Sequence, residues 1–345
     1  MRNLILHIGP PKTATTFLQE EVMSEIQATE CATGPNLPVG SEKVGFGTLF
    51  CFSPNVWQSV GESAFRDLCG ENQNEKDLLI SGEGAFGGLV SPQPWMVESA
   101  SKYGEYMELE RALSIQSDVY SLTSHLEKLQ SLSSKFGYRD LKVLFTIRRQ
   151  DTKLASEYAE VSDKVRGASQ ENFEEWARYL VNDPLGYGAS GGAKMDYFEW
   201  WKKISAVIGK NNIFVIPFEL LKKDIREFLR MWLGYINVSE KEEIIHSILG
   251  KGGETHRNKR STSKFTWSLS EPIKGPSNIS IPAGRFLTAL GLPFRVPLRW
   301  PDFSREEEIR LSDKLSDEIL IAYEKSNRLL DESLPHLSLK RYDYF

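Results

Sequence analysis

The chain has few of the features that would indicate a disulfide framework or a metal centre. Its 345 residues include only three cysteines, Cys31, Cys51 and Cys69. An odd number of scattered cysteines argues against a disulfide framework, and their spacing is not that of a zinc site. A reducing compartment is the simpler interpretation of this cysteine usage.

Long apolar runs are also missing, and none approaches the length that a membrane span requires. The chain enters its first expected strand almost at once, which leaves no room for a secretory signal peptide. A formal net charge of −5 argues against nonspecific attraction to nucleic acid or to a membrane surface. We therefore expect a cytoplasmic protein without a nucleic-acid partner and without stable membrane insertion, in which a local basic pocket could still bind an anion.

The composition is otherwise ordinary for a globular protein, with 40% hydrophobic and 26% charged residues. No internal repeat is visible. The length suits one domain over 1–345, with irregular insertions near 28–76 and 262–303. We expect no long helix within the first of these insertions.

Short apolar runs predict strands, and longer amphipathic segments predict helices. Strands are expected at 4–8, 77–81, 141–147 and 212–217. Helices are expected at 13–26, 107–136 (one helix or two), 171–182, 194–209, 225–235, 239–249 and 304–330. In the last helix, Ser304 and Glu307 have the spacing of a capping box.

The first strand leads into a loop that could bind an anion. Gly9 and two prolines interrupt the apolar run, and Lys12 then precedes the expected helix. Unpaired backbone N–H groups and the macrodipole at a helix N-terminus favour negative charge. The loop is not a Walker A motif, because Pro11 replaces the glycine before the lysine and has no N–H to donate.

This loop resembles instead the 5′-phosphosulfate loop of the sulfotransferases that use 3′-phosphoadenosine 5′-phosphosulfate (PAPS), in which the pattern is roughly PKSGTTxL. Ala14 stands where that family usually has glycine, and we expect an ordinary helical conformation there. The resemblance implies that the 5′-phosphosulfate is bound by Pro11, Lys12, Thr13, Ala14, Thr15 and Thr16.

A second segment resembles the 3′-phosphate motif of the same family, an arginine at a strand end with a serine eight residues later. Arg148 and Ser156 have this spacing, and the intervening Gln150-Asp151 resembles bacterial members. Arginine presents a planar fork of donors to phosphate oxygens. An arginine pair such as Arg148-Arg149 is otherwise often a surface feature, but the order of the two motifs favours the phosphate site.

Glu83 is the candidate catalytic base. It follows a strand and lies among glycines, at a position where open α/β sheets bind ligands. In several glycan sulfotransferases a glutamate after the corresponding strand is the base, and Glu83 looks like that residue, although a solvated loop carboxylate is the competing interpretation. His7 and His256 are alternative bases, of which His7 is better explained as a buried structural histidine.

Two further segments resemble family features less closely. Phe218 begins a segment similar to the YExLxxD pattern, where an aromatic ring commonly packs on the adenine; core packing is an equally good interpretation. A late polar loop resembles the one that closes over the nucleotide, although basic loops are more often simply solvated. Its candidate binding residues are Arg257, Asn258, Lys259 and Arg260.

Together the resemblances imply a three-layer α/β, P-loop-type fold with a central parallel sheet flanked by helices. They imply transfer of a sulfuryl group from PAPS to an acceptor hydroxyl, with Lys12 and Glu83 as catalytic residues and no metal. A saccharide or glycoconjugate acceptor is expected from similarity to bacterial and glycan-modifying members. A P-loop kinase using ATP and magnesium and a nonenzymatic PAPS- or PAP-binding protein are the alternatives, and the oligomeric state stays open.

Overall fold

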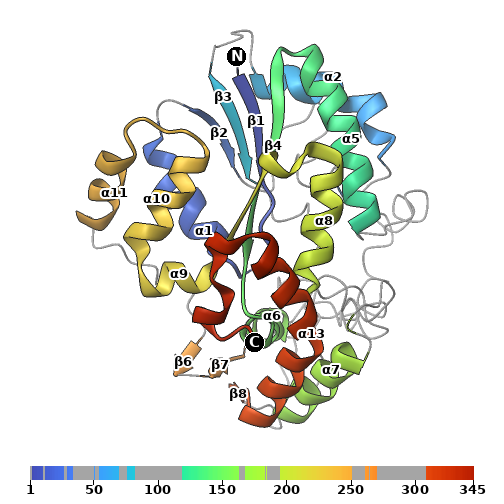
Figure 1. Cartoon of the computed structure of the whole chain (residues 1–345), viewed down its shortest axis with the longest axis vertical. Helices are drawn as coiled ribbons and strands as arrows, with labels where there is room; N and C mark the ends of the chain where they lie inside the picture. Colours follow the sequence, from blue (N-terminus) through green and yellow to red (C-terminus); the bar gives the residue numbers. More distant parts are fainter. Residues whose placement is uncertain are drawn as a thin grey trace, which may run out of the picture.

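A five-stranded parallel sheet lies at the centre of the computed structural model (Figure 1). The model describes residues 2–10, 12–26, 29–33, 50, 54–69, 76–81, 119–162, 168–182, 184, 195–250, 261–263, 265–269 and 308–345. The strands are β1 (Arg2–His7), β2 (Thr29–Thr33), β3 (Asp77–Ser81), β4 (Tyr138–Ile147) and β5 (Ile213–Pro217). Their order is β2-β3-β1-β4-β5, and every neighbouring pair is parallel.

The strands β1 and β4 lie next to each other near the middle of the sheet. Their register pairs Leu4 with Leu141 and His7 with Leu144. Because the strands are parallel and in register, the segments that follow them leave the sheet at the same edge. The carboxyl ends of such strands are where open α/β sheets bind ligands, and both predicted phosphate motifs begin there.

Helices cover both faces of the sheet, as a three-layer α/β fold requires (Figure 1). Leu4 and Leu6 pack in one hydrophobic cluster, and Ile5 between them packs in another, because successive side chains of a strand point to opposite faces. The first cluster includes residues of α2 (Val56–Cys69), α5 (Val119–Lys135) and α8 (Tyr197–Ile208). The second includes residues of α1 (Thr15–Phe17), α9 (Phe218–Lys223), α10 (Ile225–Tyr235) and α11 (Lys241–Gly250).

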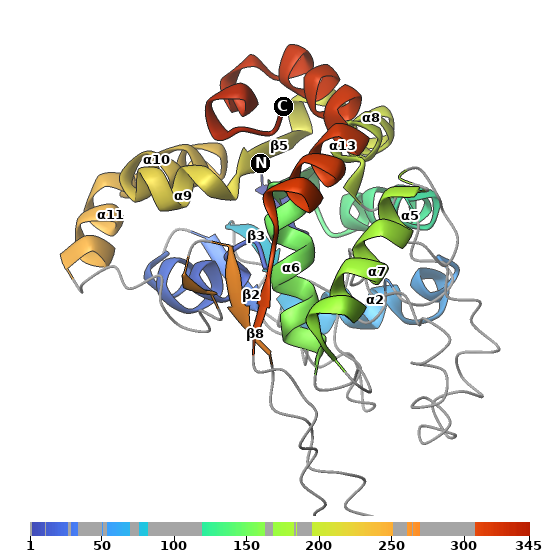
Figure 2. The ribbon, with the colours of Figure 1, turned by 90° about the horizontal axis from the view of Figure 1, so that it is seen from below.

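A third cluster lies beyond the carboxyl ends of the strands (Figures 1 and 2). It joins α6 (Gln150–Val161), α7 (Gln170–Asn182) and α13 (Asp313–Ser333). A small antiparallel sheet of β6 (Ser261–Ser263), β7 (Thr266–Ser268) and β8 (Glu308–Arg310) packs against them. The chain ends in two 3₁₀ turns, Pro335–Leu337 and Leu339–Tyr342.

The structure contradicts the expectation of no long helix within 28–76, because that segment contains α2 as well as β2. The helix is hard to recognise from sequence because Gly61 lies in its middle, and glycine disfavours helices. A Cβ at position 61 would lie 2.5 Å from the Leu132 side chain of α5, so a larger residue would require that side chain to shift. Close packing of the two helices therefore outweighs the local propensity.

The helix expected over 304–330 begins later, at Asp313. Ser304 and Glu307 lie outside the described residues, and residues 308–310 form β8 rather than helix. The helix is capped by Ser312, whose hydroxyl accepts a hydrogen bond of 3.2 Å from the Leu315 amide. The alternation of Ile309 with charged neighbours is a strand pattern, and Ile309 is buried.

None of the helices in the part of the chain that the structure describes is both long and apolar enough to cross a membrane.

Candidate nucleotide-binding site

The loop after β1 contains two non-glycine residues with left-handed backbone conformations. Lys12 has φ +68° and Ala14 has φ +69°. The expectation of a helical conformation at Ala14 is therefore wrong. Ala14 occupies the position at which the resembled motif has glycine, and glycine adopts this conformation without steric cost.

Local hydrogen bonds hold the loop in this shape. The Thr13 hydroxyl donates to the Pro10 carbonyl at 2.6 Å, and the Ala14 carbonyl accepts from the Leu18 amide at 3.0 Å. Gly9 must be small, since a Cβ there would lie 2.9 Å from Thr13 Oγ1. The Thr13 hydroxyl hydrogen therefore closes the turn, which leaves Thr15 and Thr16 as the hydroxyl donors of the loop.

The segment after the loop is helical, close to the predicted 13–26. It begins as α-helix at Thr15, continues as a π-helical turn over Leu18–Val22 and ends as a 3₁₀ turn over Met23–Glu25. Thr15 is buried at its start, and its Oγ1 has no hydrogen-bond partner among the described residues. A buried hydroxyl without a partner is costly, and a phosphate oxygen at the loop would provide one.

Arg148, directly after β4, contacts the loop. Its Nη1 donates to the Lys12 carbonyl at 2.9 Å, and its Nε donates to Thr152 Oγ1 at 3.3 Å. Lys12 and Arg148 are 136 residues apart in sequence. The two segments that resemble phosphate motifs therefore meet in one place.

The guanidinium of Arg148 is suited to bind an anion. Arg148 is only 6% exposed, and burial lowers its pKa, while the charge of Glu219 opposes this by raising it. Within the described ranges no carboxylate forms an ion pair with Arg148, and its two hydrogen bonds leave other N–H donors unused. A buried cation in this state fits a phosphate group.

Arg149 is already neutralised and so differs from its neighbour. Its Nε and Nη2 donate to the two carboxylate oxygens of Asp151 at 2.8 and 2.7 Å. Asp151 also accepts from the Ser316 hydroxyl at 2.7 Å. Of the two adjacent arginines, Arg148 is thus the one with no carboxylate partner among the described residues, and it has N–H donors left for a ligand.

One face of α6 runs alongside both cationic residues. Thr152, Ser156 and Glu160 are four residues apart and therefore share this face. Arg148 contacts Thr152 at one end, and Lys12 Nζ lies 2.5 Å from Glu160 Oε1 at the other. Ser156 is buried between them. Glu160 gives no signal in the sequence, since nothing in its spacing relates it to the loop.

The backbone around Arg148 is fixed by side chains from distant parts of the chain, of which the two tyrosines are buried and Glu219 is half-buried. The Arg149 amide donates to Glu219 at 3.0 Å, and Glu219 also accepts from the Tyr344 hydroxyl at 2.7 Å. The Arg148 carbonyl accepts from the Tyr197 hydroxyl at 2.7 Å. Burial raises the pKa of both tyrosines well above the usual value. No local pattern in the sequence points to Tyr344, because its partner Glu219 lies 125 residues away.

His7 is buried, as expected for a structural histidine. It is 0% exposed, and burial lowers its pKa to about 4. Its Nδ1 lies 2.8 Å from Ser81 Oγ, which also accepts from Gln19 at 2.9 Å. A neutral imidazole enclosed in this way supports the end of β1 against β3 and has no access to solvent.

Of the remaining predicted residues, the structure describes Phe218 but not the others. Phe218 is half-buried, with its ring 5.0 Å from the Arg148 guanidinium carbon and 5.1 Å from Lys222 Nζ. This position is compatible both with adenine stacking and with packing. Outside the described residues lie Pro11, Glu83, His256, Arg257, Asn258, Lys259 and Arg260. Among the residues that are described, no three His, Cys, Asp or Glu side chains are grouped to hold a metal ion.

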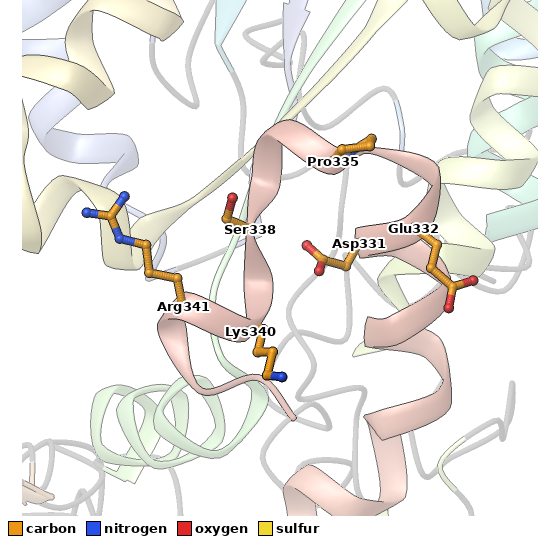
Figure 3. A pocket seen from close by; sticks show the side chains of 6 residues that line it. All are labelled: Asp331, Glu332, Pro335, Ser338, Lys340 and Arg341. Carbon is orange, nitrogen blue, oxygen red and sulfur yellow. The ribbon is translucent and has the colours of Figure 1, made fainter.

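An open cavity of about 640 Å³ lies elsewhere, at the C-terminal end of α13 (Figure 3). Asp331 and Glu332 from the helix, with Pro335, Ser338, Lys340 and Arg341 from the turns after it, line the cavity. None of them belongs to the predicted motifs, and one of the two acids is already bonded, since Asp331 accepts from the Leu339 amide at 2.7 Å.

Comparison with solved structures identifies the fold of this chain. No family model matches the sequence, and no curated protein matches it. Among solved structures, a sulfotransferase from Alicyclobacillus acidocaldarius aligns with a TM-score of 0.50 at 14% identity, over 99% of both chains. The mouse sulfotransferase SULT7A1, solved in complex with PAP, aligns with a TM-score of 0.36 at 14% identity, over 72% of this chain and 64% of that one. The likeness to the bacterial protein shows that this chain has a sulfotransferase fold, which confirms the predicted three-layer α/β architecture.

Proposed function

We propose that the protein is a PAPS-dependent sulfotransferase that transfers a sulfuryl group to an acceptor hydroxyl. The observation that carries the proposal is the contact between Arg148 and the Lys12 loop, which joins the two motifs that would bind the two ends of PAPS. The sulfotransferase fold supports it. Within the described ranges, the Thr15 hydroxyl has no hydrogen-bond partner and the Arg148 guanidinium has no carboxylate in an ion pair, and both fit an anionic ligand.

Each part of the site would hold a different part of the donor. Lys12, Thr15 and Thr16 would bind the 5′-phosphosulfate, with Pro11, Thr13 and Ala14 shaping the loop around it. Arg148 and Ser156 would bind the 3′-phosphate, and this contact would distinguish PAPS from ATP. Phe218 would pack on the adenine, and the loop with Arg257, Asn258, Lys259 and Arg260 would close over the phosphates.

The proposed chemistry follows from where charge develops. As the sulfuryl group departs from PAPS, negative charge builds on the bridging oxygen of the nucleotide. Lys12 would stabilise this charge electrostatically, which is the most effective use of a preorganised cation. Glu83 would accept the proton of the acceptor hydroxyl. His7 is less suited to this step, because it is enclosed and its lowered pKa makes it a weak base.

For the acceptor we propose a saccharide or glycoconjugate hydroxyl, on the basis of the resemblance to bacterial and glycan-modifying sulfotransferases. We further propose one domain over 1–345 and a cytoplasmic location, for which the three scattered cysteines are the support. Acceptor pockets are formed by variable loops, so the acceptor is the least constrained part of the proposal.

A P-loop kinase is the main alternative, and two observations count against it. Pro11 cannot donate to a phosphate, and a kinase acting on ATP would leave a buried Arg148 without a 3′-phosphate to bind. A nonenzymatic nucleotide-binding protein is the other alternative, and the presence of Lys12 argues against it.

Formation of PAP from PAPS in the presence of a panel of saccharide and phenol acceptors tests the proposal. We expect acceptor-dependent PAP formation by the wild type, and none by Glu83→Gln, which should still bind PAP. Turnover of ATP with magnesium in place of PAPS would support the kinase. Binding of PAP without turnover on any acceptor would support the nonenzymatic alternative.

A further inference from the structure

The ion pair between Lys12 and Glu160 is not explained by the proposed reaction. Lys12 Nζ lies 2.5 Å from Glu160 Oε1, and the two side chains are 16% and 42% exposed. Glu160 lies one helical turn beyond Ser156 on the same face of α6. An acidic residue therefore occupies the position where the loop would meet its anionic ligand.

Lys12 supplies the only formal side-chain charge of the loop from Gly9 to Thr16. With Glu160 beside it, the pair is electrically neutral. An anion that binds Lys12 must either displace Glu160 or lie close to it, and like charges a few ångströms apart repel each other. Both routes weaken the binding of every anion at this loop.

Arg148 differs from Lys12, because within the described ranges no carboxylate forms an ion pair with it. Nearby acids are occupied elsewhere: Asp151 binds Arg149, and Glu219 accepts from the Arg149 amide and from Tyr344. A ligand with a second anionic group can therefore bind Arg148 without such competition.

We propose that Glu160 weakens the binding of every anion at the Lys12 loop, so that a small anion is not retained there. Inorganic sulfate or phosphate at the loop contacts Lys12 without also contacting Arg148, and the competition with Glu160 leaves it too weakly bound there to be retained. A nucleotide with a 3′-phosphate also contacts Arg148 and Ser156 and stays bound in spite of the same competition. This inference rests on the proposed function, because it assumes that the ligand spans both cationic residues.

Calorimetric titration of PAP and of sodium sulfate into the wild type and Glu160→Gln tests the inference. Glutamine keeps the shape of the side chain and removes its charge. The matched control is Glu62→Gln, which removes a similar surface ion pair, at 3.5 Å from Lys135 on α5. Each titration is repeated at high sodium chloride, because screening weakens interactions between partly exposed charges.

We expect Glu160→Gln to bind both PAP and sulfate about fivefold to tenfold more tightly at low salt, the size expected for one partly exposed charge a few ångströms away. The gain should shrink at high salt, sulfate should become a competitor of PAP in this variant, and Glu62→Gln should bind like the wild type. A merely structural role for Glu160 would not produce this salt dependence.

Unchanged or weaker binding of both anions by Glu160→Gln would overturn the inference. Unchanged binding with lost turnover would also overturn it and would make Glu160 a candidate base instead. If the wild type fails to bind PAP, the proposed function fails; the sulfate titrations of the two variants still decide whether Glu160 weakens anion binding at Lys12.

Discussion

The loop after β1 and the segment after β4 lie side by side, but they are held in place by different means. Lys12 and Ala14 in the loop have φ values of +68° and +69°, and the Lys12 side chain extends to a partly exposed carboxylate. Arg148 follows a regular strand, is 6% exposed, and has its flanking backbone bonded by Tyr197 and Glu219.

This difference indicates which kind of substitution should disrupt each half of the site. The loop depends on backbone conformation, so it should respond to substitutions that change the φ preference. The Arg148 segment depends on side chains from α8, α9 and the C-terminus, so it should respond to side-chain truncation far away in sequence. The four predictions below separate the two halves, from the largest expected effect to the smallest.

The largest effect is expected for Lys12→Met, because Lys12 would act on the charge that develops during transfer. We expect kcat to fall by about 10²- to 10³-fold, the typical loss on removal of one such stabilising group. Arg148→Lys should mainly raise the KM for PAPS, since lysine lacks the planar fork. Steady-state kinetics of both variants measure the split, and equal losses of kcat would contradict the division of roles.

His7 at the end of β1 should make stability depend on pH. Its pKa in the folded protein is about 4, below the value of about 6.5 of an unfolded chain, so the unfolded state binds more protons between these values. Stability should therefore fall as the pH falls from 6.5 to 4, by about 3 kcal/mol from this residue. Urea unfolding against pH measures the slope, which should be flatter in His7→Asn. An identical slope in that variant would show that His7 is not the source.

Loss of the Tyr344 hydroxyl should weaken the Arg148 side. Tyr344→Phe removes the bond to Glu219 and leaves this half-buried carboxylate with one partner fewer, at a cost of about 1–2 kcal/mol. Chemical denaturation measures this loss. Tyr179→Phe is the control, because Tyr179 is 50% exposed on α7; comparable losses in the two variants would refute a special role for the C-terminus.

Ala14→Gly should stabilise the protein, an unusual result for a glycine substitution. It removes the left-handed strain at position 14, and we expect a gain of about 1 kcal/mol. Ala322→Gly, within the helix α13, should instead cost about 1 kcal/mol. The melting temperatures of the two variants should therefore move in opposite directions. A loss at both positions would mean that Ala14 is not strained.

The sequence predicts the parts of the fold that have local patterns. The four predicted strands, the helix over Ile225–Tyr235 and the buried Leu315, Ile319 and Tyr323 of α13 are all found. The helix α2 was missed because Gly61 masks it, and its glycine is explained only by contact with Leu132. The helix α13 begins later than predicted because Ser304 and Glu307 have the spacing of a capping box, whereas the cap in the structure is Ser312.

In the candidate site, too, only the features with a local sequence pattern could be predicted. The spacing of Arg148 and Ser156 could be read from sequence, and their proximity to Lys12 follows from two parallel neighbouring strands. The left-handed conformation of Ala14 has no signal in alanine itself, and only the glycine of the resembled motif at this position indicates it. Glu160 and Tyr344 could not be found either, since each meets the site through tertiary contacts.

The central claim is that Lys12 and Arg148 form one site for a nucleotide with a 3′-phosphate. The most direct test is a thermal-shift titration of the wild type and Arg148→Ala with PAP, ADP and ATP with magnesium. A ligand at a hundred times its Kd stabilises the native state by about 2.7 kcal/mol, which is readily measured. We predict strong stabilisation of the wild type by PAP, weak stabilisation by ADP, and no such preference in Arg148→Ala. Preference for ATP with magnesium, or a PAP preference that survives in Arg148→Ala, would contradict the claim.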